Sequence, residues 1–373
     1  MKSSKLLTGC VVATASLAIV ASLFLSQRRS SVIPGNQANP PKQSAAAESM
    51  DVVFVLDTTS SMSQLIEGAK RKIWSIASQL STSNSDLDLR IGLVAYRDKT
   101  DEYVTKVVPL NSNMDEVYAQ LRQFAAHGGG DGPEHVNKGL SDALHRMQWR
   151  SKADRHIFLV GDAPPHDDYN DTPKSHELAQ KAKDKGIALH AIRCGHDMST
   201  QYAWTRIAKL GGGTYASIAQ NGGMKQVATR YDTELKRLND KLSGSVVAYG
   251  KDADKVRRHV TARKSMGAGA SADNAFYAAT AKKVMKGDLV DEISSGAVDL
   301  EGVPEAELPS ALQGKSIAEQ RKWVKNVQKK RDKLKEKIRK LSAARRGVIK
   351  RKKPASASPS FDETVIRATK RKR

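Results

Sequence analysis

Asp51-Val-Val-Phe-Val-Leu-Asp-Thr-Thr-Ser-Ser-Met62 places five apolar residues directly before a polar cluster. An apolar run of this kind, bounded by polar residues, predicts a buried strand of a parallel sheet. The polar cluster then lies at the carboxyl end of the strand, where open α/β sheets bind their ligands. Asp57, Thr59 and Ser61 offer one carboxylate and two hydroxyl oxygens, which suit Mg²⁺, Mn²⁺ or Ca²⁺ rather than zinc or copper. Taken alone, the cluster is equally well explained as a loop that caps a helix beginning near Ser63.

Two further loops carry carboxylates at the spacing expected of alternating strands and helices. Gly128-Gly-Gly-Asp-Gly-Pro-Glu134 is a glycine-rich loop with an acidic residue at its centre. His156-Ile-Phe-Leu-Val-Gly-Asp-Ala-Pro-Pro165 predicts a second buried strand that ends in a carboxylate. Because the carboxyl ends of parallel strands meet at one edge of a sheet, Asp57, Asp131 and Asp162 can converge on one point.

The three loops together resemble the von Willebrand factor A domain and its metal-ion-dependent adhesion site, in the form found in a bacterial membrane-anchored or secreted subgroup. The resemblance covers about residues 50–219, a little under half of the chain. It implies a divalent-cation-dependent protein-binding module that is not an enzyme. The expected cation is Mg²⁺, with Mn²⁺ or Ca²⁺ as alternatives, and an oxygen of an unidentified protein ligand would complete its coordination. The implied metal ligands are Asp57, Thr59, Ser61, Asp131 and Asp162.

Two positions depart from the better-known adhesive members of that family. Those members carry threonine where Asp131 stands, and Thr-Asp-Gly where Gly161-Asp162-Ala163 stands. A carboxylate at position 131, with Glu134 close behind, adds negative charge to the site. Added negative charge holds a cation more tightly and makes it a weaker acceptor for an acidic ligand. The site is therefore expected to be more structural, or to prefer a less acidic partner.

The alternation of apolar patterns predicts an α/β fold, a doubly wound and mainly parallel sheet flanked by helices, with a C-terminal helical extension. The expected domain spans residues 50–242. The predicted strands are 52–56, 87–96, 103–110, 156–161, 187–193 and 214–217, the third of them an antiparallel edge strand. The predicted helices are 64–80, 114–124, 136–147, 174–185, 201–209 and 226–242. The last of these is expected to close the domain on its far side.

The chain changes character after the expected domain. Residues 243–315 form an Ala-rich segment that we expect to be irregular, and no fold is predicted for it. Residues 316–349 predict a basic charged helix in which apolar residues recur every seven positions. Arg331 and Arg345 interrupt that seam, which argues against a strong two-stranded coiled coil. We expect the helix to pack against the Ala-rich segment or across a partner, followed by a basic, disordered tail at 350–373.

The N-terminal segment predicts export. Leu6 to Leu25 is an uncharged stretch of twenty residues flanked by basic residues, which is long enough to cross a bilayer. Residues 1–29 are therefore expected to be a signal anchor or a cleaved signal peptide, followed by a flexible linker at 30–49. Leu7-Thr-Gly-Cys10 resembles a lipoprotein processing box, but the apolar core follows it instead of preceding it. We expect a membrane-anchored or secreted protein of the cell envelope with its domain on the extracytoplasmic side.

Positive charge is concentrated near the C-terminus. The net charge is +22, and the residues from Glu301 onward contribute 23 Lys and Arg against 8 Asp and Glu. This asymmetry favours an anionic lipid or polymer as a partner of the tail. Nucleic acid is not favoured, because Trp323 and Phe361 are the only aromatic residues after Tyr277 and base stacking needs more. A solvated charged helix without a partner remains an alternative.

Two other function classes remain open. One is a structural or scaffolding envelope protein in which the metal only braces the loops and the tail makes the contacts. The other is a metal-dependent hydrolase, which needs a base near the cation, and only Glu134 or His166 could serve. The histidines beside the loops lack the spacing of a zinc site and have no thiolate partner.

Overall fold

The computed structural model describes residues 48–83, 87–130, 132–223, 227–280, 285–352 and 359–370. The expected signal anchor and nearly all of the expected linker lie outside these ranges. Within them, no helix combines the length and the apolar character needed to cross a membrane.

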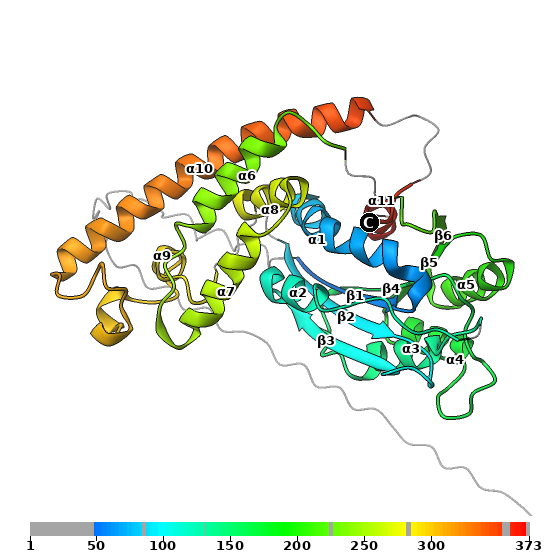
Figure 1. The fold of residues 1–373 in the computed structure, drawn as a ribbon. Helices are drawn as coiled ribbons and strands as arrows, with labels where there is room; N and C mark the ends of the chain where they lie inside the picture. The colour runs from blue at the N-terminus through cyan, green and yellow to red at the C-terminus, as the bar shows by residue number, and fades with distance from the viewer. Residues whose placement is uncertain are drawn as a thin grey trace, which may run out of the picture. The chain divides into compact units, whose positions relative to one another are not determined.

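Six strands form one sheet in the order β3-β2-β1-β4-β5-β6 (Figure 1). Every neighbouring pair is parallel except β2 with β3, which is antiparallel. This topology confirms the predicted doubly wound, mainly parallel sheet and its antiparallel edge strand. The strands are β1 Ser49–Asp57, β2 Asp88–Tyr96, β3 Thr105–Asn111, β4 Asp154–Gly161, β5 Ala188–Cys194 and β6 Gly212–Ile218.

Both faces of β1 are buried, which explains its unbroken apolar run. Val52 and Phe54 belong to the core on one face of the sheet, and Val53 and Val55 belong to the core on the other. A strand covered on both faces gains from apolar residues at every position, whereas a half-exposed strand alternates. The central position of β1 in the sheet therefore follows from its sequence.

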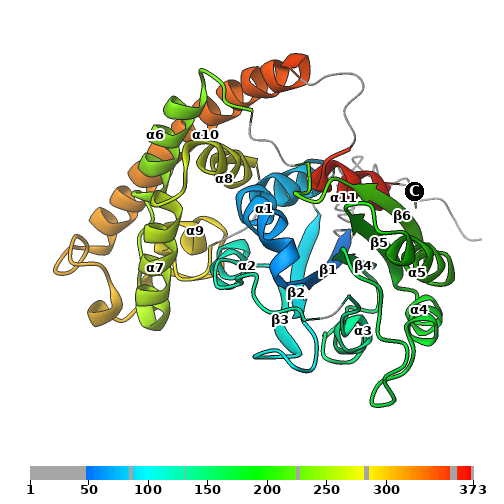
Figure 2. The same ribbon diagram turned by 45° about the vertical axis from the view of Figure 1, so that its right-hand side comes forward.

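Helices cover both faces of the sheet (Figure 2). The 3₁₀ turn Ser60–Met62 leads into α1, which packs with α2 on one face, and α3, α4 and α5 pack on the other. The apolar positions of each helix recur every three or four residues and so face the strands. The bounds are α1 Ser63–Ser83, α2 Met114–Leu121, α3 Val136–His145, α4 Ser175–Asp184 and α5 Met198–Leu210.

Three α-helices lie within the Ala-rich segment, so the expectation that 243–315 is irregular is wrong for residues 253–264, 268–280 and 289–294. Its alanines pack against large apolar side chains of other helices, with Ala272 and Ala275 beside Leu235, Leu238 and Ile338. Small side chains let helices approach closely, and that gain depends on partners distant in sequence. The helices are α6 Asp232–Ser243, α7 Ala253–Lys264, α8 Ala268–Thr280, α9 Leu289–Ser294 and α10 Ile317–Lys352, with 3₁₀ turns at Gly250–Asp252, Leu300–Gly302 and Glu305–Glu307. We call α6 to α10 the helical module.

Helix α6 does not close the sheet, which corrects a second expectation. It begins at Asp232, six residues later than predicted, and packs against α7, α8 and α10. Helix α10 also lies against the Ala-rich segment, which is one of the two arrangements expected from its sequence.

The two arginines in the α10 seam are buried with carboxylate partners. Arg331 Nη1 lies 2.8 Å from Asp288 Oδ2, and Arg345 Nε lies 2.6 Å from Asp232 Oδ1. Arginine forms several hydrogen bonds at once from a planar group, so it tolerates burial better than lysine. The seam of α10 is thus held by ion pairs as well as by apolar contacts.

The predicted disordered tail contains a packed helix, α11 Phe361–Lys370, which corrects a third expectation. Phe361 is buried with its ring centroid 5.7 Å from that of Phe54, and its N–H donates to the Gly222 carbonyl. Helix α11 contacts α1, β5 and β6, so it covers part of the sheet face on which α1 lies (Figure 1). The remainder of the predicted tail, 353–358 and 371–373, lies outside the described residues.

Candidate metal centre

The first loop brings its three predicted ligands together directly after β1. The backbone N–H and the hydroxyl of Thr59 both donate to Asp57 Oδ1, at 2.8 and 2.6 Å. Ser61 Oγ lies 3.4 Å from Thr59 Oγ1. An aspartate that binds the backbone two residues ahead makes a compact turn. The turn therefore presents one carboxylate and two hydroxyls side by side, as the spacing predicted.

The third loop places Asp162 next to the first loop. Asp162 follows the last residue of β4, the strand that pairs with β1. The side-chain amide of Gln220 donates to Asp162 Oδ2 at 2.5 Å and to the Ser61 carbonyl at 3.3 Å. Gln220 thus joins the first and third loops, and sequence reasoning missed it. Its position just past the end of β6 could have indicated it, because parallel strands end at the same edge.

The glycine-rich second loop is tied to the other two by backbone hydrogen bonds. The Ser60 N–H donates to the Gly128 carbonyl at 3.2 Å, and the Glu134 N–H donates to the Pro164 carbonyl at 3.0 Å. Asp131 itself lies outside the described residues, so its contribution to the site stays a prediction. The loop that carries it nevertheless meets the first and third loops at one edge of the sheet.

Gly161 explains one departure from the adhesive members of the family. A Cβ atom at this position would lie 2.6 Å from the Tyr96 hydroxyl and 2.9 Å from Asp57 Cβ. Neither distance is compatible with a side chain, so the larger threonine of the adhesive members would need both neighbours to move. Tyr96 is fully buried beneath Asp57 and occupies the space that a residue at position 161 would need.

Negative charge is concentrated at this edge of the sheet. The pKa of Asp57 is raised to about 7, chiefly by burial and in part by the nearby Asp162 carboxylate, whereas the hydrogen bonds from Thr59 lower it. Burial and the same two carboxylates raise the pKa of the Tyr96 hydroxyl and of the Cys194 thiol. The region therefore favours a positive charge, which a bound cation would provide.

A cavity of about 510 Å³ opens over the three loops. Ten of the thirteen residues that line it are serine, threonine, aspartate, glutamate or glycine. The residues that line it include Thr59, Ser61, Gly129, Glu134, Asp162 and Asp197.

The side chains present fit a hard divalent cation. Asp57 is fully buried, and its Oδ2 atom has no hydrogen-bond partner in the part of the chain that the structure describes. The neighbouring oxygens are two hydroxyls and the Asp162 carboxylate, a donor set typical of Mg²⁺, Mn²⁺ or Ca²⁺. Among the described residues no group of three or more His, Cys, Asp or Glu side chains is placed to hold a metal. The expected third carboxylate, Asp131, lies outside the described residues.

The histidines beside the loops pack around Tyr169. The His166 ring stacks on the Tyr169 ring with centroids 4.1 Å apart, and its Nδ1 lies 2.8 Å from Asp168 Oδ1. The His135 ring meets Tyr169 edge-on at 5.0 Å. Because both rings pack against the same tyrosine, they contribute to the packing of the loop that follows β4.

Residues 51–230 match the family model described as von Willebrand factor A domain. This range contains nearly all of β1, the other five strands and the three loops. The match covers 180 of the 373 residues, just under half of the chain, and this part of the chain is similar to that family. Such domains are in general protein-interaction modules.

Individual relatives match only parts of the chain. The alpha-protein kinase vwkA of Dictyostelium discoideum is 31% identical over 122 residues, which are 32% of this chain and 19% of the kinase. The chain thus spans about a fifth or less of the length of the curated relatives it matches. The structure of BatB from Bacteroides thetaiotaomicron is 18% identical, covering 46% of this chain and 90% of BatB, with a TM-score of 0.35.

A second solved structure is that of proximal thread matrix protein 1 from the mussel byssus, with a zinc-occupied MIDAS motif. It is 14% identical and covers 47% of this chain and 43% of its own, with a TM-score of 0.38. Since both TM-scores are low, the assignment of the fold rests on the family match and on the sheet topology.

Proposed function

We propose that the von Willebrand factor A domain of this chain binds a protein partner through a divalent cation held by its three loops. The observation that carries the proposal is the buried Asp57 carboxylate, whose Oδ2 atom has no hydrogen-bond partner among the described residues. A buried, unpaired carboxylate oxygen costs free energy that a bound cation would offset. The function is binding, without a chemical reaction.

Each side chain of the site has a role in this proposal. The hydroxyls of Thr59 and Ser61 would hold the cation directly, and Asp57, Asp131 and Asp162 would hold it directly or through water. The cation would supply the positive charge for which an oxygen of the partner protein would be the last ligand.

The charge of the site sets the preferred cation and partner. All of the proposed ligands are oxygen atoms, so Mg²⁺ is the expected cation and Mn²⁺ or Ca²⁺ would substitute for it. Glu134 lines the cavity, and with Asp162 it surrounds the cation with negative charge. A strongly neutralised cation attracts a carboxylate less, so we expect the partner to offer a carbonyl or hydroxyl oxygen.

The decisive experiment is the substitution Asp57→Ala. We expect it to abolish Mg²⁺ binding in isothermal titration calorimetry and to leave the circular dichroism spectrum of the folded protein unchanged. Asp184→Ala, which removes an exposed carboxylate of α4, is the matched control and should bind Mg²⁺ normally. Undiminished Mg²⁺ binding by the Asp57→Ala protein would overturn the proposal.

The location of the protein belongs to the same proposal. The uncharged N-terminal stretch supports a membrane-anchored or secreted protein of the cell envelope with its domain on the extracytoplasmic side. Cleavage of the domain by a protease added to intact cells would support this location, and protection until the cells are lysed would contradict it.

A second candidate function rests on α10. Its buried face includes Val324, Arg331 and Ile338, and exposed lysines follow one another along the opposite side at intervals of three or four residues. Residues at these intervals share one face of a helix. No ion pair or hydrogen bond joins these lysines to another described residue. They are Lys322, Lys325, Lys329, Lys333 and Lys337, which we call the lysine face. The lysine face supports binding to an anionic lipid surface.

A further inference from the structure

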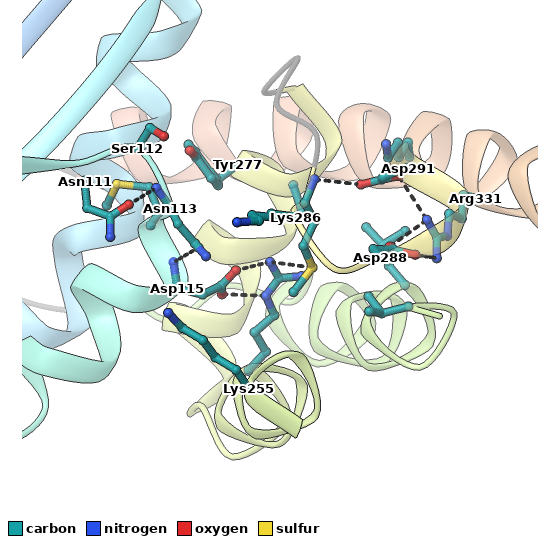
Figure 3. Close-up of a pocket in the computed structure, with 17 residues that line it drawn as sticks. Asn111, Ser112, Asn113, Asp115, Lys255, Tyr277, Lys286, Asp288, Asp291 and Arg331 are labelled. Carbon is teal, nitrogen blue, oxygen red and sulfur yellow. Dashed lines mark hydrogen bonds and ion pairs between the residues drawn. The ribbon is translucent and has the colours of Figure 1, made fainter. Parts of the chain in front are cut away.

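A second cavity lies between the von Willebrand factor A domain and the helical module (Figure 3). Its volume is about 350 Å³, within the range of small-molecule binding sites. Residues 111–115, between β3 and the start of α2, form one side of it. Residues of α6, α7, α8, α9 and α10 and the segment before α9 form the rest. A molecule in this cavity would contact both parts of the chain.

The wall of this cavity carries more positive than negative charge. Its carboxylates are those of Asp115, Asp288 and Asp291. Its cations are Lys255, Arg263, Lys286, Arg331 and Lys335. Five cations against three carboxylates leave a formal charge of +2 on the lining residues themselves, before the carboxylate partners that two of the lysines have outside the lining are counted.

The two arginines form ion pairs with the three carboxylates, and these five groups together keep one negative charge (Figure 3). Arg263 Nε lies 2.7 Å from Asp115 Oδ1, and a second hydrogen bond from the same guanidinium reaches the other oxygen of Asp115. Arg331 Nη1 lies 2.8 Å from Asp288 Oδ2 and 2.9 Å from Asp291 Oδ1. The positive charge available to a ligand therefore belongs to the three lysines.

Of the three lysines, Lys335 is the one without an ion pair among the described residues. Its side chain is half-buried, and no hydrogen bond or ion pair joins it to another residue in the described ranges. The amino group of Lys286 is 3.7 Å from Asp252, and that of Lys255 is 2.7 Å from Glu116 Oε2. A partly desolvated ammonium group without an anionic partner favours binding of an anion.

Neutral hydrogen-bonding groups surround the lysines. Asn111, Ser112 and Asn113 come from the von Willebrand factor A domain, and Tyr277 comes from α8. Burial raises the pKa of the Tyr277 hydroxyl, so this group stays protonated and can donate a hydrogen bond. Amides and hydroxyls beside a cationic centre suit a polar molecule that carries an anionic group.

We propose that this cavity binds phosphate, free or as part of a small phosphorylated molecule. Lys335 contacts the phosphate oxygens, Lys286 and Lys255 add positive charge at the rim, and the asparagines and Tyr277 bind the remainder of the ligand. Lysine binds phosphate as a mobile point charge. The site is separate from the metal centre and does not depend on its function.

The test compares two lysines of α10. Lys335→Met removes the half-buried charge in the cavity, whereas Lys337→Met removes an exposed charge of the lysine face. Binding is measured by calorimetry with inorganic phosphate and with glycerol 3-phosphate at constant ionic strength. We expect Lys335→Met to weaken binding by about tenfold or more, and Lys337→Met to leave it unchanged.

Two further measurements complete the test. The melting temperature of each variant without phosphate shows that Lys335→Met is folded, and Asp57→Ala should bind phosphate as the unaltered protein does. Tighter binding of glycerol 3-phosphate than of inorganic phosphate identifies a phosphorylated molecule as the ligand, and equal or weaker binding identifies free phosphate. The absence of binding to both probes, or an equal loss in the two lysine variants, would overturn the proposal.

Discussion

At the scale of single residues, Asp57 is subject to two opposing effects. Its Oδ1 atom is held by two hydrogen bonds from Thr59, which favour the ionised carboxylate. Its burial and the neighbouring Asp162 disfavour that form and raise its pKa from 3.8 to about 7. Without a cation, the folded protein at neutral pH therefore either holds a buried charge or keeps a proton that the unfolded chain has released.

This shift gives the metal-free protein a distinct dependence of stability on pH. The folded-state pKa is raised, so the stability that the protonated carboxylate allows is present below about pH 4 and is lost as the pH rises to about 7. A cation that binds only the folded state adds stability, and it competes with the proton at low pH. We expect Mg²⁺ to raise the melting temperature more at about pH 8 than at about pH 5.

The measurement is differential scanning fluorimetry at both pH values, with Mg²⁺ and with a chelator. Asp57→Asn should abolish the effect of Mg²⁺, and Asp184→Asn should retain it. An equal rise in melting temperature at the two pH values in the unaltered protein would contradict the prediction.

Some residues of the candidate site could be predicted from the sequence and others could not. Asp57 and Asp162 could be predicted, because each directly follows an apolar run and strand ends meet at one edge. Gly161 could not, because the need for a glycine comes from the position of the Tyr96 hydroxyl, which is a product of tertiary packing. Gln220 was missed, although its place just past a predicted strand indicated the same edge of the sheet.

At the scale of elements, α11 adds buried apolar side chains to the core on one face of the sheet. Phe361, Val365 and Ala368 recur at intervals of four and three residues and are buried in the core that α1 shares with the sheet. In sequence order, the helical module lies between the last strand and α11. Helix α11 then returns to the sheet and covers part of one of its faces. The strands could be predicted from the sequence, because unbroken apolar runs make their core contacts. The ten residues of α11 could not be predicted as a packed helix, because basic clusters and a Pro/Ser-rich segment flank them.

Removing the largest side chain of α11 should destabilise the whole domain. Phe361 is almost fully buried beside Phe54, so Phe361→Ala leaves a cavity that the surrounding side chains cannot close. We expect a loss of about 3–5 kcal/mol in the free energy of unfolding, measured by urea denaturation. Tyr202→Ala removes an aromatic ring that is 75% exposed and should cost less than about 1 kcal/mol. A cost for Phe361→Ala as small as that of the control would show that α11 is not part of the core.

At the scale of the whole molecule, the charged residues of α10 include a buried pair and an exposed set. Arg331 and Arg345 are buried against carboxylates of the helical module, whereas the five lysines of the lysine face are exposed. The guanidinium group is weakly hydrated and suits burial, whereas the ammonium group is strongly hydrated. The distribution of charged residues in the sequence showed that most of the net positive charge lies near the C-terminus. It could not show which charges are neutralised, because the partner carboxylates lie far away in the sequence.

This division determines how the lipid-binding candidate can be tested. Deleting residues 347–373 would remove α11 together with the basic clusters, so a loss of binding would also report a damaged core. Substitution of exposed lysines avoids this difficulty. Lys329, Lys333 and Lys337 lie on the lysine face, and none has an ion pair within the described residues.

We expect the triple substitution of these lysines by Gln to weaken binding to phosphatidylserine vesicles by about a hundredfold. Each lysine near an anionic bilayer contributes about 1 kcal/mol, and 1.4 kcal/mol corresponds to about a tenfold change. The control replaces Lys181, Lys185 and Lys209, which are exposed on α4 and α5 or just after α4, and has the same net charge. Binding should fall with salt and persist in a chelator, because it is electrostatic and independent of the metal centre. An equal loss in the two triple variants would mean that net charge, and not the lysine face, attracts the membrane.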